Sequence, residues 1–524
     1  MPTWISSPFL GLVLASVAQA GTPEVFVDPI AGVDAPGQGS QSAPYRSIRY
    51  ALDQNPGPVG VVLAAGTYTT PLESFPLALG AGDRLRGPVT GGARIRGTGV
   101  GVNAPHAVLV DSGDGPGVVQ LENIFFESAS GSPLIDLDAR PAADGSLVVQ
   151  VRDCTLLGNG RGVRVRTAAG VSPAVVLDCT RVEVRSLTQA FDLVFASGTV
   201  GFLRFDNCFI SGQAAGISVR AQGGTSGPAA VFAEASRTVF ERCTPALLSR
   251  SDGNGSLSWI VDSCVLTGSG FTVCPEPLAP GAGAILDLGT TVAGNLTYAI
   301  TRSVFWTNWP WCAPDPAGAG LIVDLGSYRP ADYVVDRNVI QQSAPAGGWS
   351  GVNVSGDPRF FRYSPTAIGS NDYHVLAGSP AINWGGGPPN KDDFEGDPVV
   401  SPCGDGTSDA GVDEHRPAAL WLAPGPKLGA TSELRMIGPA LGWAVVYGGA
   451  PLGTSTCDGT LGIAPLFPMA LLVPLDSAGT ARVPLAVPTL PSLLGLDFAA
   501  QGFFATPEGT FGGLSAVREY TLEL

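Results

Sequence analysis

The sequence contains few lysines and histidines. Its lysines are Lys391 and Lys427 and its histidines are His106, His374 and His415, so arginine supplies nearly all of the positive charge. The formal net charge is −16 at pH 7. An acidic molecule repels nucleic acid and anionic membrane surfaces, so neither is an expected partner. Acidic polysaccharides are repelled in the same way, unless Ca²⁺ or a local cluster of arginines intervenes.

The sequence also lacks the motifs of several enzyme classes. It has no Walker phosphate loop, no G-x-S-x-G nucleophile elbow and no H-E-x-x-H zinc helix, so nucleotide, α/β-hydrolase and zinc-protease chemistry have no support. None of the nine cysteines forms a C-x-x-C pair, which disfavours a zinc site. After the first twenty residues, no stretch reaches the ~18 uninterrupted apolar residues of a membrane helix, so no membrane span is predicted.

The first twenty residues are typical of a secretory signal peptide. Phe9 to Val17 form a short apolar core, and Ala18-Gln19-Ala20 resembles a signal-peptidase site. No lysine or arginine precedes the apolar core, and a buried N-terminal strand is the alternative interpretation. We predict that residues 1–20 are a signal peptide and that the protein is secreted, either extracellular or at the cell surface.

Glycine, proline and small apolar residues are abundant. The chain has 71 Gly and 45 Pro, yet 44% of its residues are hydrophobic. This composition excludes a disordered chain and is typical of many short strands joined by turns. Three segments share one pattern, because Cys154-Thr-Leu-Leu-Gly158 is matched by Cys208-Phe-Ile-Ser-Gly212 and by Cys264-Val-Leu-Thr-Gly268. A repeat at this spacing predicts an all-β solenoid with coils of roughly twenty to thirty residues.

The repeat also predicts which side chains face the interior. Successive side chains of a strand point to opposite faces. Val163 and Val165 are therefore expected inside, with Arg164, Arg166 and, in the next copy, Arg220 outside. A small, soft side chain at one repeated position suits a stacked interior row. We predict a buried thiol ladder rather than disulfides or metal ligands for Cys154, Cys179, Cys208, Cys243 and Cys264.

The two ends of the solenoid have different signatures. Near the N-terminus, a short helix starting at Pro44 would place Tyr45, Ile48 and Leu52 on one apolar face and cover the first coil. After residue 416 the polar-Cys repeat stops, and short apolar runs alternate with proline-bounded turns. Residues 417–524 are therefore predicted to form a small β-sandwich-like domain.

Two segments resemble a known superfamily. Val25-Phe26-Val27-Asp28-Pro29, Ala43-Pro44-Tyr45-Arg46-Ser47-Ile48 and Gly66-Thr67-Tyr68 resemble the entry segment of the pectin-lyase-like right-handed parallel β-helix superfamily, and in particular the DUF1565 domain. Gly356-Asp357-Pro358-Arg359-Phe360 and Gly378-Ser379-Pro380-Ala381-Ile382 resemble its exit segment. The resemblance implies a right-handed parallel β-helix domain over residues 21–416. Residues 24–70 would form its cap and first coil, and residues 353–416 its closing segment.

The superfamily resemblance implies contact with polysaccharide but no particular activity. Its enzymes act on acidic polysaccharides as lyases, hydrolases or epimerases, and other members only bind. This sequence lacks the Gly-His-Gly and Arg-Ile-Lys motifs of the polygalacturonase-like hydrolases. A lyase needs a positioned base, typically Arg or Lys, often with Ca²⁺ to acidify the proton that is removed. No motif marks such an arginine here.

Two groups of charged residues are candidates for contact with a glycan. The first is Asp136, Asp138 and Arg140, which share one face of a strand and could hold Ca²⁺ or a sugar; a solvated turn is the alternative. The second is Arg164, Arg166 and Arg220. If consecutive coils stack these arginines, they form a basic strip that could grip a carboxylate or sulfate. Ion pairs with acidic residues of neighbouring coils are the alternative.

Three further features are weaker candidates. The acidic residues Asp393, Asp397, Asp405 and Asp409 could form a Ca²⁺ cage, although their spacing departs from the usual loop, and capping of the last coil is the alternative. Cys274 and Cys312 could form a disulfide, with Cys403 and Cys457 as a second pair. Trp306 and Trp309 could stack on a sugar ring or anchor a loop.

Three functions therefore stay open. The first is a secreted or surface β-helix protein that contacts polysaccharide without catalysis. The second is a polysaccharide lyase or a related glycan-acting enzyme with an arginine base. The third is a structural or adhesion protein in which the solenoid is a rigid spacer. No cofactor is certain, and Ca²⁺ is the one ion that the sequence suggests. Function resides in sites rather than in the fold, so the outward side chains must decide.

Overall fold

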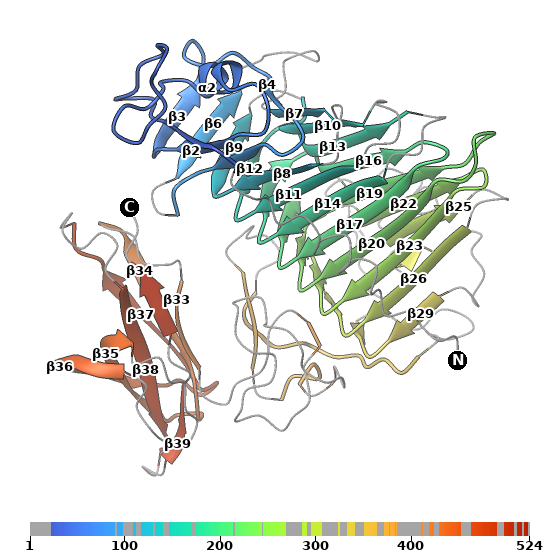
Figure 1. The fold of residues 1–524 in the computed structure, drawn as a ribbon. Helices are drawn as coiled ribbons and strands as arrows, with labels where there is room; N and C mark the ends of the chain where they lie inside the picture. The colour runs from blue at the N-terminus through green and yellow to red at the C-terminus, as the bar shows by residue number, and fades with distance from the viewer. Residues whose placement is uncertain are drawn as a thin grey trace. The chain divides into compact units, whose positions relative to one another are not determined.

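A computed structural model gives the fold (Figure 1). It describes residues 22–89, 92–97, 108–111, 117–128, 132–139, 146–168, 174–212, 215–243, 245–268, 286–290, 295–306, 323–324, 333–340, 351–363, 371–376, 378–382, 384, 410–411, 419–423, 429–451, 463–489, 497–507, 511–515 and 518–521. The chain divides into two compact units. The first comprises residues 1–356 and 364–370, and the second residues 357–363 and 371–524.

The described strands of the first unit form three parallel sheets, which Figure 1 shows as stacked coils. Sheet 1 contains β1 (Glu24–Val27), β2 (Gly60–Leu63), β5 (Arg84–Arg86), β8 (Gly117–Glu122), β11 (Leu147–Arg152), β14 (Ala174–Thr180), β17 (Val200–Asp206), β20 (Ala230–Ser236), β23 (Ser256–Asp262), β26 (Asn295–Thr301) and β29 (Tyr333–Asp336). Sheet 2 contains β3 (Gly66–Thr69), β6 (Ala93–Gly97), β9 (Ile124–Ser128), β12 (Thr155–Gly158), β15 (Glu183–Leu187), β18 (Phe209–Gly212), β21 (Val239–Glu241), β24 (Val265–Thr267), β27 (Val304–Trp306) and β30 (Val339–Ile340). Sheet 3 contains β4 (Leu77–Leu79), β7 (Val108–Asp111), β10 (Ile135–Ala139), β13 (Arg161–Thr167), β16 (Gln189–Phe195), β19 (Ile217–Gln222), β22 (Leu247–Asp252), β25 (Leu286–Thr290) and β28 (Val323–Asp324).

Each coil passes through sheets 1, 2 and 3 in turn, and each strand pairs in parallel with the equivalent strand of the next coil. The predicted right-handed parallel β-helix is confirmed. Its interior follows the alternation that the sequence showed. In β13, Val163 and Val165 are fully buried, whereas Arg164 and Arg166 point outward and are half-buried. Apolar rows stacked in this way supply most of the folding free energy, because burial removes apolar surface from water.

The turn from sheet 1 to sheet 2 repeats with a left-handed residue in each coil. Its φ angle is near +50° to +60° at Asn123, Asp153, Arg181, Asn207, Arg237, Ser263, Arg302 and Arg337. The next residue points inward. Where it is Thr238 or Ser303, its hydroxyl accepts a hydrogen bond from a backbone N–H of the preceding coil. The backbone N–H of Cys208 donates to Thr238 Oγ1 (3.4 Å), and that of Cys264 donates to Ser303 Oγ (3.1 Å). One tight turn is thus reproduced coil after coil.

The position of each cysteine relative to this turn shows which of the five predicted thiols share one axial row. Cys154, Cys208 and Cys264 follow the left-handed residue on alternate coils, so they occupy one axial row, with Val182 and Thr238 between them. Cys179 lies within β14, beside Phe205, and Cys243 follows β21. The five-membered row is therefore wrong, because similar local sequence recurs at two other places in the coil. All five thiols are free and buried, as predicted.

These five thiols are expected to resist alkylation in the folded protein. Burial raises the pKa of Cys154, Cys208 and Cys243 to about 12, and only the thiolate reacts. At pH 8 iodoacetamide should modify none of the five within an hour, and all of them in denaturant. Peptide mass spectrometry assigns each site. Modification of Cys208 in the native protein would contradict the burial.

The N-terminal cap is confirmed as a helix, but its predicted start is wrong. Helix α2 runs from Ile48 to Gln54, with Ser47 as its N-cap residue, rather than from Pro44. Tyr45 instead pairs with Val27 as an isolated parallel bridge. The carboxylate of Asp34 accepts hydrogen bonds from the backbone N–H groups of Arg46 and Ser47, which holds this segment extended. No helix in the described part of the chain is long and apolar enough to cross a membrane.

The second unit is a β-sandwich. One sheet contains β33 (Ala419–Ala423), β34 (Thr431–Ile437) and β37 (Thr480–Ala486), and the other contains β35 (Trp443–Pro451), β36 (Ile463–Pro474), β38 (Asp497–Ala505), β39 (Phe511–Leu514) and β40 (Arg518–Thr521). Their strands are antiparallel. Leu434 and Met436 from the first sheet pack with Val473 and Phe504 from the second, which confirms the predicted sandwich.

The second unit begins earlier in the chain than residue 417. The antiparallel pair β31 (Phe360–Arg362) and β32 (Asp372–Val375) belongs to it. Phe361 contacts the Trp421 ring edge-on, and His374 stacks on Trp421 with ring centroids 3.9 Å apart. In the segment predicted to close the helix, Asn353 does extend the last turn, because its Oδ1 accepts from the backbone N–H of Asn338. The described residues 357–363 and 371–376 instead belong to the second unit.

Candidate functional site

The outer face of sheet 3 holds most of the charged residues that the sequence singled out. Parallel pairing aligns Asp136, Arg164, Asp192 and Ser218 in one outward row, one residue per coil. A second outward row contains Arg166, Val194, Arg220 and Arg250. Neighbouring strands lie about 4.8 Å apart, so successive side chains of a row follow one another at short intervals along the solenoid.

Ion pairs fix the charged groups of this face. Arg164 donates from Nε and Nη2 to the two carboxylate oxygens of Asp136, with 2.7 Å between Nε and Oδ1. Asp192 accepts from Arg166 at 2.6 Å and lies 3.2 Å from Arg161 Nε. Arg220 pairs with Asp252, which lies further along the same sheet. Asp136 and Asp192 are buried, whereas the guanidinium groups reach solvent, so the face is rigid and accessible.

The predicted basic strip of arginines is wrong. Arg164 lies in the row between two aspartates, and Val194 separates Arg166 from Arg220. Arg164, Arg166 and Arg220 each pair with a carboxylate, which was the alternative interpretation. Asp136 and Asp138 do share one strand, β10. The side chain of Asp138 and the whole of Arg140 lie outside the described residues.

The other predicted site residues are mostly outside the described part of the chain. This applies to Trp309, to the Ca²⁺ candidates Asp393, Asp397, Asp405 and Asp409, and to the disulfide candidates Cys274 and Cys312 with Cys403 and Cys457. Trp306 ends β27, beside Thr267, and is half-buried. Within the described residues, no group of three His, Cys, Asp or Glu side chains is placed to hold a metal ion.

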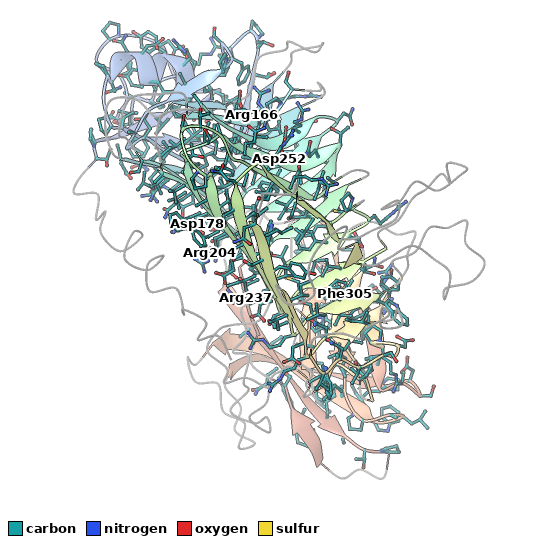
Figure 2. All side chains as sticks on the ribbon, turned by 90° about the vertical axis from the view of Figure 1, so that its right-hand side faces the viewer. Arg166, Asp178, Arg204, Arg237, Asp252 and Phe305 are labelled. Atoms are coloured by element: carbon teal, nitrogen blue, oxygen red, sulfur yellow. The ribbon has the colours of Figure 1, made fainter. Side chains whose placement is uncertain are left out.

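Sequence reasoning missed a second charged network, on the outer face of sheet 1. Arg204 lies between Asp178 (3.7 Å) and Asp206 (2.8 Å), and Arg237 donates three further hydrogen bonds to Asp206. Figure 2 shows Asp178, Arg204 and Arg237 following one another along the solenoid. Asp178 and Asp206 precede a repeat cysteine by one and two residues, so the polar residue before each cysteine was the available signal.

The charge state of two buried carboxyl groups follows from their surroundings. Burial alone would raise the pKa of Asp206, but Arg237 outweighs it and holds the pKa below the usual range, so this carboxyl is ionised at neutral pH. Guanidinium groups that donate to carboxylates offer no lone pair to a substrate proton. Glu73, whose pKa burial raises to about 7, accepts hydrogen bonds from the backbone N–H groups of Ile48 and Arg49 and so caps helix α2.

Three sheets of stacked parallel strands define the first unit of the chain as a right-handed parallel β-helix. Its residues 30–130 match the family model described as protein of unknown function DUF1565. A rhamnogalacturonan lyase is similar at 11% identity and a TM-score of 0.34, over 65% of this chain and 91% of that chain. Full-length tailspike protein 2 of Escherichia coli O157:H7 bacteriophage CAB120 is similar at 9% identity and a TM-score of 0.24, over 96% of this chain and 68% of that chain. The curated proteins contain no match.

Proposed function

We propose that this protein is an exported β-helix that binds polysaccharide along the outer face of sheet 3 without catalysing a reaction. The observation that carries the proposal is the series of fixed ion pairs on consecutive coils, Asp136–Arg164, Arg166–Asp192 and Arg220–Asp252. Export is supported by the signal-peptide pattern in residues 1–20.

The chemistry of these pairs suits hydroxyl groups. A guanidinium has five N–H donors, and the arginine side chains of these pairs are 26%, 37% and 52% exposed, so a ligand in solution can reach them. A sugar hydroxyl both donates and accepts, so it can accept from these guanidinium groups and donate to the partly exposed Asp252 carboxylate. Since the groups are already held in place, little side-chain entropy is lost when a ligand binds. A long polymer can contact several coils at once, which multiplies weak contacts.

The proposal predicts that Arg166→Ala and Arg220→Ala together weaken polysaccharide binding about tenfold. Affinity electrophoresis in gels that contain one soluble polysaccharide each, neutral or acidic, measures the retardation. Arg181→Ala is the matched control, because Arg181 is also an exposed arginine paired with an aspartate, Asp153, but lies in the turn between sheets 1 and 2. Equal retardation of all variants by every polysaccharide that binds would overturn the site.

The same set of polysaccharides distinguishes this proposal from the two alternatives, a polysaccharide lyase and a structural protein. Incubation of the protein with uronic-acid polysaccharides and Ca²⁺ should leave the ultraviolet absorbance unchanged. A steady rise, which reports an unsaturated product, would make the protein a lyase and overturn the non-catalytic part of the proposal. Failure of every polysaccharide to retard the wild-type protein would overturn the glycan-binding part and favour a structural role.

A further inference from the structure

The outer face of sheet 1 carries an aromatic patch on a different side of the coil from sheet 3. One outward row of sheet 1 contains, coil by coil, Val118, Val148, Val176, Phe202, Phe232, Ser258 and Thr297. The three valines are buried, with exposed fractions of 3–8%, and Phe202 is half-buried. Phe232 is 52% exposed. The apolar row therefore reaches solvent at Phe232 and then changes to hydroxyl side chains.

One side of the Phe232 ring is covered and the other is open. Phe202 and Phe232 stack with ring centroids 5.6 Å apart and planes inclined by 15°. Phe202 comes from the preceding coil, so it occupies the ring face on that side. On the following coil the partner residue is Ser258, whose side chain is too short to cover a phenyl ring. The Thr297 hydroxyl, one coil further on, donates to Ser258 Oγ at 2.9 Å, so the row continues from the ring as a hydrogen-bonded pair of hydroxyls.

The neighbouring outward row completes the surroundings. Glu234 lies two residues after Phe232 on β20 and therefore on the same face. Ile260, which pairs with Glu234 from the next coil, is 43% exposed. A flat aromatic surface and a branched apolar side chain thus lie next to two hydroxyls and a carboxylate. Exposed apolar groups rimmed by polar ones mark interaction sites.

The composition of this patch selects among classes of ligand. Two phenyl rings and one isoleucine fall far below the roughly 800 Å² that each partner buries in a stable protein interface. Polyanions are disfavoured by Glu234 and by the net charge of −16. A pyranose ring fits both requirements, because it has an apolar C–H face of about the size of a phenyl ring and hydroxyls around its edge.

We propose that Phe232, supported by Phe202 and flanked by the Ser258–Thr297 hydroxyl pair, is a subsite for one uncharged pyranose ring of a polysaccharide. The inference shares the ligand class of the proposed function but uses separate residues on another sheet. The ring of the sugar lies on the open face of Phe232, and its edge hydroxyls bond to Ser258, Thr297 and Glu234. A polymer bound here runs over sheet 1, independently of sheet 3.

Affinity electrophoresis of the full chain in dextran, galactomannan, arabinoxylan or laminarin tests the subsite. At least one of these neutral polysaccharides should retard the wild-type protein, and Phe232→Ala should need about tenfold more polysaccharide for the same retardation. Phe232→Tyr keeps the ring and should bind like the wild type. Phe209→Ala is the matched control, because Phe209 is an outward, half-buried phenylalanine of sheet 2. Far-ultraviolet circular dichroism verifies that the variants are folded.

Three results of the affinity electrophoresis would overturn the subsite. They are no retardation of the wild type by any neutral polysaccharide, equal retardation of wild type and Phe232→Ala, and a loss in Phe209→Ala as large as that in Phe232→Ala. A change in sedimentation coefficient for Phe232→Ala without polysaccharide would instead make the patch a self-association surface, and also overturns the subsite. The Arg166→Ala, Arg220→Ala variant separates the two proposals. Loss of binding in that variant alone supports sheet 3 and overturns the subsite, and loss in Phe232→Ala alone does the reverse.

Discussion

Replacing Asp206 with alanine is expected to lower the free energy of unfolding of the solenoid by about 3–5 kcal/mol. The Asp206 carboxylate is 3% exposed and accepts hydrogen bonds from Arg237, Arg204 and Ser236. Without it, Arg237, whose side chain is only 14% exposed, loses the carboxylate that accepts three of its hydrogen bonds. Urea unfolding at pH 7, followed by circular dichroism, should show the shift in midpoint.

A matched variant controls for the loss of one carboxylate. Asp252→Ala breaks a pair of the same type with Arg220, but the two side chains are 26% and 52% exposed. Water solvates both charges there, so the expected loss is below about 1 kcal/mol. Equal midpoints for Asp206→Ala and Asp252→Ala would contradict the argument that burial sets the cost.

The contribution of Asp206 should depend on pH in one direction. Its pKa in the folded protein lies below the usual range, because Arg237 outweighs the effect of burial. An unfolded Asp titrates near pH 4. A lowered pKa stabilises the fold fully above that value and loses its effect as the pH falls through the folded pKa. The difference between the wild type and Asp206→Ala should therefore shrink below about pH 4.

The interior of the solenoid could be predicted from the sequence because it depends on local alternation. In Val163-Arg164-Val165-Arg166 each residue's face follows from its neighbours alone, and the structure buries both valines. The alternation is a property of any strand, so it needs no knowledge of the rest of the fold. The start of helix α2 depended on distant residues. Asp34 and Glu73 accept hydrogen bonds from the backbone between Arg46 and Arg49. The sequence around the helix does not indicate that these two distant carboxylates lie beside it.

The charged faces could not be predicted for a related reason. Arg164 meets Asp136 from 28 residues earlier, and Arg166 meets Asp192 from 26 residues later. Which acid lies beside which arginine depends on the length of the loops between coils, and those lengths vary along the chain. A shift of one residue moves a side chain to the other face of its strand. Local sequence therefore identified the outward arginines, and only the register showed that each is paired.

The same reasoning applies to a polar cluster buried in the second unit. The Asp372 carboxylate is 6% exposed, lies 2.6 Å from Nδ1 of His374 and accepts a hydrogen bond from Arg435. Burial would raise its pKa, but His374 and Arg435 together hold the pKa below the usual range, so the group carries a charge in the folded protein. Asp372 joins β32 to β34, which lie more than fifty residues apart in the chain.

Replacing Asp372 with alanine should destabilise this unit by about 3–5 kcal/mol, because Arg435 is buried and loses its main counter-charge. Hydrogen exchange of the full chain, read by mass spectrometry, should show faster exchange in peptides from β32 and β34 and unchanged exchange in β17 of the solenoid. Glu433→Ala is the control, since Glu433 also accepts from Arg435 (2.8 Å) but its side chain is 32% exposed. Its effect should stay below about 1 kcal/mol. Unchanged protection of β32 in Asp372→Ala would mean that the stacking of His374 on Trp421, rather than the ion pair, holds β32 in this unit.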